Sequence, residues 1–234
     1  MTNDIRSMNE IPERLNSVRE RIRAAAAASG RDPDQVTLLA VSKTRPVSDI
    51  LAAHAAGQRR FGENYLQDAL PKVRGLDGAD IEWHFIGRLQ SNKTAEVAHH
   101  FAWVHGLDRL KHAERLSTQR PAELPPLQVC IQVNMSGEAS KGGVAPDELP
   151  GLALAVAALP RLRLRGLMTM PDPSSEPQVQ REAFARLRGL LDGLRAQGLA
   201  LDTLSMGMSG DMEAAIAEGA TIVRIGTDIF GSRG

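Results

Sequence analysis

Short apolar runs alternate with amphipathic stretches along most of the chain. The first run, 36–42, is nearly continuous in apolar residues, which is typical of a parallel strand covered on both faces. Further runs of strand length lie at 58–62, 81–86, 101–105, 127–133, 162–168, 201–206 and 221–225. Between the runs lie stretches with helical spacing, such as 108–118 and 179–195, so the repeated unit is a strand followed by a helix.

Eight such units predict a closed (β/α)₈ barrel of the TIM type. An open doubly wound sheet is the alternative, but no strand is followed by the GxGxxG turn of a dinucleotide-binding sheet. The length of 234 residues is also near that of one barrel. We therefore expect a single α/β domain over 1–234, with its core at about 8–232.

A helix is expected before the first strand. Apolar residues recur there at helical spacing, at Ile11, Leu15, Val18 and Ile22. Pro12 is the predicted entry signal of this helix, and Gly30 followed by Pro33 is the predicted exit.

Composition and charge exclude several classes of partner. Lys plus Arg and Asp plus Glu each count 28, so the formal net charge is zero and no basic field exists to recruit nucleic acid or anionic lipid. Near the N-terminus the longest uniform apolar stretch is the five alanines 24–28, which is too short for a signal core or a membrane span. Cys130 is the only cysteine, so no internal disulfide can form and a reducing cytoplasm is expected.

Lys43 ends the first predicted strand. Groups at the carboxyl ends of barrel strands converge on the mouth, where binding sites lie. A lysine at that place is partly desolvated, which favours the neutral amine, and a neutral amine attacks an aldehyde. The alternative is a lysine whose ammonium group reaches solvent from the strand end.

Two loops near the end of the chain have the features of a phosphate site. The run 205–212 joins the seventh strand to a helix through two glycines and Ser209, which leaves backbone N–H groups exposed. Gly226 and Thr227 follow the eighth strand, and the loops after strands seven and eight commonly hold a phosphate in barrels. Each loop is alternatively an ordinary turn with a capping hydroxyl.

Two polar residues near the predicted mouth need a partner. Arg224 lies within an apolar strand, where a guanidinium needs an acceptor or an anion. A structural partner such as Asp211 or Asp228 is one expectation; if a pyridine ring lies between Lys43 and the phosphate site, Arg224 would instead donate to the ring nitrogen. Asn64 follows the second strand and either reaches a ligand in the mouth or caps the next helix, with the cap slightly favoured.

Other titratable residues carry weaker signals. The histidines form no HxxxH pair with a nearby glutamate on one helix, so no metal site is expected and they are interpreted as polar or core residues. Lys93 follows the third strand as a secondary ligand candidate. Lys141 lies in a loop after the fifth strand and is expected to be a surface charge.

Six motifs occur in the order of a known family. They are Ala40-Val41-Ser42-Lys43, Phe61-Gly62-Glu63-Asn64, His84-Phe85-Ile86-Gly87, Gln90-Ser91-Asn92-Lys93, Leu204-Ser205-Met206-Gly207-Met208-Ser209-Gly210-Asp211 and Val223-Arg224-Ile225-Gly226. Over about residues 8 to 232 the chain closely resembles the pyridoxal phosphate (PLP) homeostasis protein family, which looks like the N-terminal barrel of alanine racemase without its β domain. Arg88 departs from the family pattern, which often reads Gly-Pro-Leu-Gln at that place.

The resemblance implies a set of cofactor-binding residues, Lys43, Asn64, Met206, Ser209, Arg224, Gly226 and Thr227. In that set Lys43 matches the Schiff-base lysine and Arg224 matches the arginine that faces the pyridine nitrogen. Ser209, Gly226 and Thr227 match the phosphate-binding positions, and Met206 resembles a residue that lines the cofactor site.

The resemblance also implies a PLP carrier in vitamin B6 and amino-acid homeostasis, with no catalytic residues. Racemisation in alanine racemase needs a second base, a tyrosine of the missing domain, and Tyr65 would replace it only if it pointed into the mouth. A minor PLP-dependent amino-acid racemase is the alternative, and a barrel that binds a phosphorylated sugar without a Schiff base is a third. The carrier is expected to be a monomer, with apo PLP-dependent enzymes as candidate recipients.

Overall fold

The computed structural model describes residues 2–135, 142–172, 174 and 176–232. Parallel strands pair in chain order and β8 pairs with β1, so the sheet is a closed barrel and the predicted fold is confirmed. The strands are β1 (Thr37–Val41), β2 (Arg60–Glu63), β3 (Glu82–Phe85), β4 (Trp103–Leu107), β5 (Leu127–Gln132), β6 (Leu162–Met168), β7 (Thr203–Ser205) and β8 (Ile222–Ile225).

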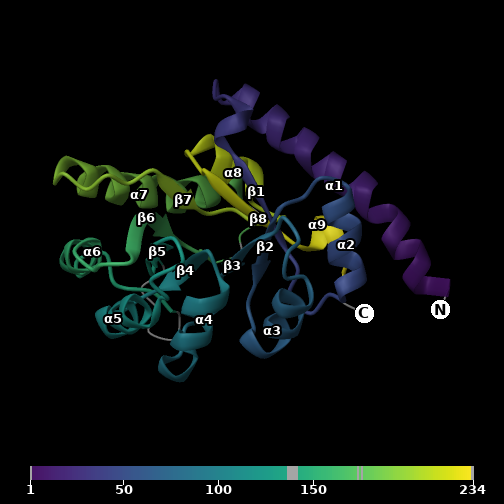
Figure 1. Ribbon diagram of the computed structural model, residues 1–234. Helices are drawn as coiled ribbons and strands as arrows, with labels where there is room; N and C mark the ends of the chain where they lie inside the picture. The colour runs from purple at the N-terminus through teal and green to yellow at the C-terminus, as the bar shows by residue number, and fades with distance from the viewer. Residues whose placement is uncertain (1, 136–141, 173, 175, 233–234) are drawn as a thin grey trace.

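Helices surround the barrel (Figure 1). They are α2 (Val47–Ala55), α3 (Leu66–Gly75), α4 (Thr94–His100), α5 (Leu110–Gln119), α6 (Leu149–Ala157), α7 (Pro177–Ala196), α8 (Met212–Ala217) and the single turn α9 (Thr227–Phe230), with 3₁₀ helices at η1 (Pro33–Gln35) and η2 (Ser91–Lys93). Among the described residues, no helix is both long enough and apolar enough to cross a bilayer.

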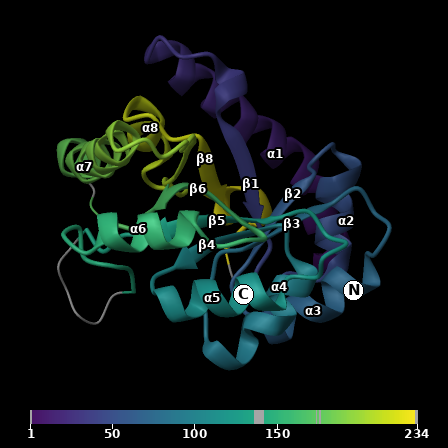
Figure 2. The ribbon, with the colours of Figure 1, turned by 60° about the vertical axis from the view of Figure 1, so that its left-hand side comes forward.

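The first helix, α1 (Thr2–Ala28), begins before Pro12, so the predicted entry signal is wrong. Proline costs a helix interior one backbone hydrogen bond, and the buried side chains of Ile11 and Leu15 on either side offset that cost. The helix packs against α2, α8 and α9. Figures 1 and 2 show it on the outside of the barrel, beside α2. Because α9 is only one turn long, α1, which packs on it, extends the layer of helices at this part of the barrel.

Strand β4 lies two residues later than the predicted run 101–105. Phe101 is the C-cap of α4, with its N–H donating to Val97 O at 3.1 Å, and its ring packs on Phe85 at 5.4 Å between centroids. An apolar residue at a helix end and one at a strand start look alike in sequence, which explains the shift.

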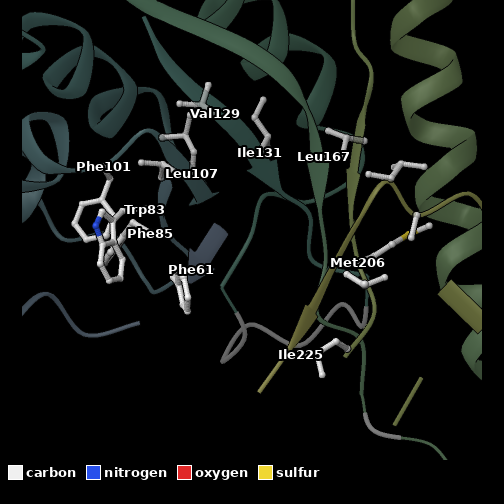
Figure 3. Packing of buried hydrophobic residues seen from close by; sticks show 14 of the residues in the cluster. Phe61, Trp83, Phe85, Phe101, Leu107, Val129, Ile131, Leu167, Met206 and Ile225 are labelled. Atoms are coloured by element: carbon white, nitrogen blue, oxygen red, sulfur yellow. The ribbon is translucent and has the colours of Figure 1, made fainter. Parts of the chain in front are cut away.

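Residues along each strand alternate between the barrel interior and an outer layer beneath the helices. The outer layer is the larger one, and Figure 3 shows part of it, from the aromatic group of Phe61, Trp83, Phe85 and Phe101 to Met206 and Ile225. The apolar residues of the interior are Leu39, Val41, Ile86, Trp103, Cys130, Met168 and Ile222. The alternation decides which side chain at each strand end enters the mouth.

Candidate functional site

A cavity of about 250 Å³ opens at the carboxyl ends of β1, β2, β7 and β8. Six of the seven predicted site residues line it, namely Lys43, Asn64, Ser209, Arg224, Gly226 and Thr227. The structure also brings Arg45, Met170 and Met208 into the wall, which the sequence analysis did not single out. Residues from opposite ends of the chain therefore meet at one site.

Lys43 enters the cavity because of the strand alternation. Val41 belongs to the barrel interior, and Ser42 turns outward to donate from its Oγ to Glu63 Oε1 at 2.6 Å. Lys43, the next residue, is half-buried and lines the cavity. Thr44 then adopts a left-handed conformation with φ 63°, and its N–H donates to Asp68 Oδ2 at 2.8 Å, which fixes the chain directly after the lysine.

A buried ionic cluster supports the loop that carries Lys43. The Lys72 ammonium donates to Glu63 Oε1 at 3.0 Å and to Asp68 Oδ2 at 2.7 Å. It also donates to the Ser42 carbonyl at 3.1 Å, so it ties β1 to β2 and α3. Burial raises the pKa of Glu63, against the opposing effects of Ser42 and Lys72, and Glu63 Oε2 has no hydrogen-bond partner among the described residues.

The loops after β7 and β8 lie together on one side of the cavity, tied by an arginine of α1. Arg21 donates from Nη1 to Asp228 Oδ2 at 2.5 Å and from Nε to Glu213 Oε1 at 2.9 Å. The N-cap of α8 is Asp211, which accepts from the Met208 N–H at 2.6 Å. Ser209 therefore does not cap α8, and it lines the cavity.

Arg224 is buried inside the barrel with 4% of its surface exposed. It donates from Nη1 to Ser205 Oγ at 2.7 Å and from Nη2 to the Thr169 carbonyl at 2.9 Å. The predicted pairing with Asp211 or Asp228 is wrong as a hydrogen bond, since Asp228 accepts from Arg21 instead. Burial lowers the pKa of Arg224 to about 10, so the guanidinium stays charged at neutral pH.

Met206 does not line the cavity, which corrects the prediction for this residue. Its side chain is fully buried in the outer layer of the core (Figure 3). Ser205 points into the barrel, where it accepts from Arg224, so the next residue points outward. Met208, two residues further along, lies in the cavity wall.

Asn64 lies in the wall between this cavity and a neighbouring one of about 500 Å³. The N-cap of α3 is Tyr65, so Asn64 does not cap the helix and that interpretation is wrong. Gly87 permits this placement, because a Cβ there would lie 2.0 Å from the Asn64 carbonyl oxygen.

Tyr65 and Lys93, the candidates for a second base and a secondary ligand, both line the neighbouring cavity. Tyr65 is 55% exposed and lines this cavity rather than the one with Lys43. Lys93 also lines it, whereas Lys141 lies outside the described residues. The structure therefore separates both Tyr65 and Lys93 from the wall that holds Lys43 and Arg224.

Two histidines form part of a polar chain behind Arg224. His105 Nδ1 lies 2.7 Å from Ser205 Oγ, and His105 Nε2 lies 2.9 Å from His84 Nδ1. Within the described ranges, no three His, Cys, Asp or Glu side chains are placed to hold a metal ion. Sequence spacing could not reveal the polar chain behind Arg224, because His105 and Ser205 are 100 positions apart.

Comparisons with known proteins place the chain in a family. The model of the alanine racemase N-terminal domain matches residues 14–234. Pyridoxal phosphate homeostasis proteins of Pseudomonas aeruginosa and Escherichia coli are 62% and 56% identical to the chain, over 97% of it and 97% and 98% of their own lengths.

Solved structures agree with this placement. PipY of Synechococcus elongatus, determined with PLP bound, matches with a TM-score of 0.83 and 37% identity, over 94% of this chain and all of that one. Alanine racemase of Corynebacterium glutamicum matches with a TM-score of 0.67 at 20% identity, over 94% of this chain and 62% of that one, which shows likeness of fold alone. The chain belongs to the pyridoxal phosphate homeostasis protein family.

Proposed function

We propose that this protein binds PLP reversibly at Lys43 and carries or buffers it in vitamin B6 and amino-acid homeostasis. The observation that carries the proposal is the single cavity in which Lys43, Arg224 and the loops after β7 and β8 meet. The family membership and the PLP-bound structure of PipY support the same ligand.

The residues of the cavity fit PLP by their chemistry. When bound, PLP supplies a reactive aldehyde, and the Lys43 amine is the group in the wall that can form a Schiff base with it. The hydroxyls of Ser209 and Thr227, with backbone N–H groups of the same loops, suit a phosphate. Met170 and Met208 add adaptable apolar surface suited to a ring.

Arg224 suits storage better than catalysis. Its guanidinium has five N–H donors, two of which are used by Ser205 and Thr169, so donors remain for a ring nitrogen. Even with its lowered pKa of about 10 it keeps its own proton at neutral pH. A group that donates a hydrogen bond without giving up its proton leaves the pyridine a weak electron sink, which limits carbanion chemistry.

A second base is the feature that a racemase would need. Tyr65 is the only tyrosine of the chain, and it lies largely exposed in the neighbouring cavity. We infer that the protein is not an enzyme, with a minor racemase as the competing function. We further propose that it acts as a cytoplasmic monomer and releases PLP to apo PLP-dependent enzymes.

The test of this function compares two lysine variants. Wild-type protein mixed with PLP should show the visible absorption band of a Schiff base, and Lys43→Ala should lose it. Lys93→Ala is the matched control, because Lys93 lines only the neighbouring cavity, and it should keep the band. A colourless wild type would refute the proposal.

Activity assays separate the carrier from the racemase. A carrier loaded with PLP should activate an apo PLP enzyme faster than it releases PLP to a trapping amine in bulk solvent. Steady racemisation of alanine or serine that depends on Lys43 would instead support the racemase.

A further inference from the structure

A continuous hydrogen-bonded chain runs through the interior of the barrel behind Arg224. Arg224 Nη1 lies 2.7 Å from Ser205 Oγ, which lies 2.7 Å from His105 Nδ1. His105 Nε2 lies 2.9 Å from His84 Nδ1, and His84 Nε2 lies 3.0 Å from Glu82 Oε1. Every link has the length of a normal hydrogen bond.

Arg224 and Glu82, at the two ends of the hydrogen-bonded chain, fix the direction in which its members donate. Arginine can only donate, so Ser205 Oγ accepts from Arg224 and turns its own hydrogen toward His105 Nδ1. A neutral His105 then carries its proton on Nε2 and donates to His84 Nδ1. His84 in turn carries its proton on Nε2 and donates to the Glu82 carboxylate, which can only accept.

If the hydrogen bonds were donated in the opposite direction, polar atoms of His84 and Ser205 would be left without a partner. If His84 donated from Nδ1, its bare Nε2 would face the Glu82 carboxylate, so two acceptors would meet. The Ser205 hydroxyl would also accept from both neighbours and lose the acceptor for its own hydrogen. Unmade hydrogen bonds of buried groups are costly, which selects the first direction.

Burial keeps both imidazoles in the neutral form that this direction requires. Desolvation lowers the pKa of His84, and it lowers the pKa of His105 well below the usual value, with further lowering by His84 and Arg224. The His84 ring is stacked on Trp103, with centroids 5.3 Å apart and planes 4° from parallel. A protonated His105 would present an N–H donor to both Ser205 and His84, so the hydrogen bonds could no longer be donated in one direction.

The hydrogen-bonded chain ends, at Glu82, on the opposite face of the barrel from Lys43. Glu82 is the first residue of β3, and it lines a cavity of about 830 Å³. Thr37, Thr203 and Ile222, which begin β1, β7 and β8, line the same cavity, so it lies at the amino-terminal end of the parallel strands. Glu82 and His84 both line this cavity, so the hydrogen-bonded chain begins in its wall.

We propose that Ser205, His105, His84 and Glu82 are positioning residues for Arg224, and that they couple the amino-terminal cavity to the retention of the cofactor. The chain holds one edge of the guanidinium, so its remaining donors keep one orientation toward the cavity of Lys43. This inference rests on the proposed function only for the identity of the bound group. The hydrogen bonds that set the order join residues of the protein alone.

The first test therefore uses the protein without PLP. Nitrogen-15 NMR of the imidazoles distinguishes the two neutral tautomers and the cation at neutral pH. Both His84 and His105 should be neutral and protonated at Nε2. A cation at either position, or a proton on Nδ1 of either ring, would overturn the proposed order even if PLP binding is established.

The second test measures how fast PLP leaves, using a residue at the far end. Glu82→Met removes the terminal acceptor without touching the cavity of Lys43, and PLP release should accelerate roughly two- to thirtyfold, the range of coupling through such networks. Asp202→Leu is the matched control. Asp202 lines the same amino-terminal cavity and pairs with Arg165, but it is not part of the hydrogen-bonded chain from Arg224 to Glu82. Equal release rates in the two variants would refute the coupling.

Two variants of His105 test the middle of the hydrogen-bonded chain. His105→Leu removes both hydrogen bonds, whereas His105→Gln keeps one acceptor and one donor. We expect PLP to leave His105→Leu about tenfold faster than wild type and His105→Gln at an intermediate rate. Equal rates in these two variants would contradict the positioning role. If His105→Leu does not fold, the comparison of Glu82→Met with Asp202→Leu still decides the proposal, because both sites are part-exposed.

Discussion

Among the residues that support the Lys43 loop, Lys72 of α3 is predicted to be the one whose loss is most costly to the fold. Its side chain is 6% exposed and that of Glu63 is 0% exposed, and Nζ lies 3.0 Å from Oε1. Lys72→Met keeps the apolar stem but leaves the Glu63 carboxylate buried with Ser42 as its remaining donor. Breaking a buried ion pair on one side typically costs about 3–5 kcal/mol, which we expect in the free energy of unfolding.

The pH dependence of this cost identifies its cause. Burial already raises the folded pKa of Glu63, and removal of Lys72 should raise it further. A carboxyl with a raised folded pKa stabilises the fold below the unfolded value, about 4.3, and that stability is lost as the pH rises through the folded pKa. The cost of Lys72→Met should therefore be large at pH 7 and shrink toward pH 4.5.

A double-mutant cycle in urea completes the experiment. Glu63→Gln with Lys72→Met replaces the charges by neutral groups, and the oxygen of the introduced amide can still accept from Ser42. We expect this double variant to regain more than half of the stability lost in Lys72→Met. A cost below about 1 kcal/mol for Lys72→Met, or a double variant as unstable as the sum of the single ones, would refute the reasoning.

Two further predictions follow from the site and the barrel interior. Met206→Ala should lower the free energy of unfolding by about 2–5 kcal/mol without changing PLP release, whereas Met208→Ala should speed PLP release with a smaller loss of stability. Thermal unfolding and the Schiff-base band measure these effects, and the reverse pattern would contradict the assignment. Because burial lowers the folded pKa of His105 below the unfolded value of about 6.5, its neutral form stabilises the fold above pH 6.5 and this stability is lost as the pH falls. The free energy of unfolding, measured in urea, should fall less between pH 7 and pH 5.5 for His105→Gln than for the wild type. An equal fall in the two proteins would argue against a neutral buried imidazole.

The barrel and most of its mouth could be predicted from sequence because both depend on local order. Nearly continuous apolar runs mark the strands, and a residue just after a run lies at the mouth once the barrel closes. This reasoning predicts that Lys43, Ser209, Gly226 and Thr227 lie together, and the structure places all four in the wall of one cavity. Arg224 was found because a charge within an apolar strand needs a partner.

The rest depends on contacts that no local pattern encodes. Met206 was misplaced because one step of strand alternation decides whether a side chain faces the barrel interior or the outer layer. The partners of Arg224 could not be predicted, since Thr169 is 55 positions away in the chain. Pro12 was mistaken for a helix start because the burial that sustains the helix through it becomes visible only in the packed structure.

The central claim is that the Lys43 amine holds the cofactor. Borohydride reduction of the PLP-loaded protein converts a Schiff base into a stable amine link, and peptide mapping by mass spectrometry then locates it. We expect one modified peptide, with the pyridoxyl group on Lys43. A label on any other lysine, or no label at all, would contradict it.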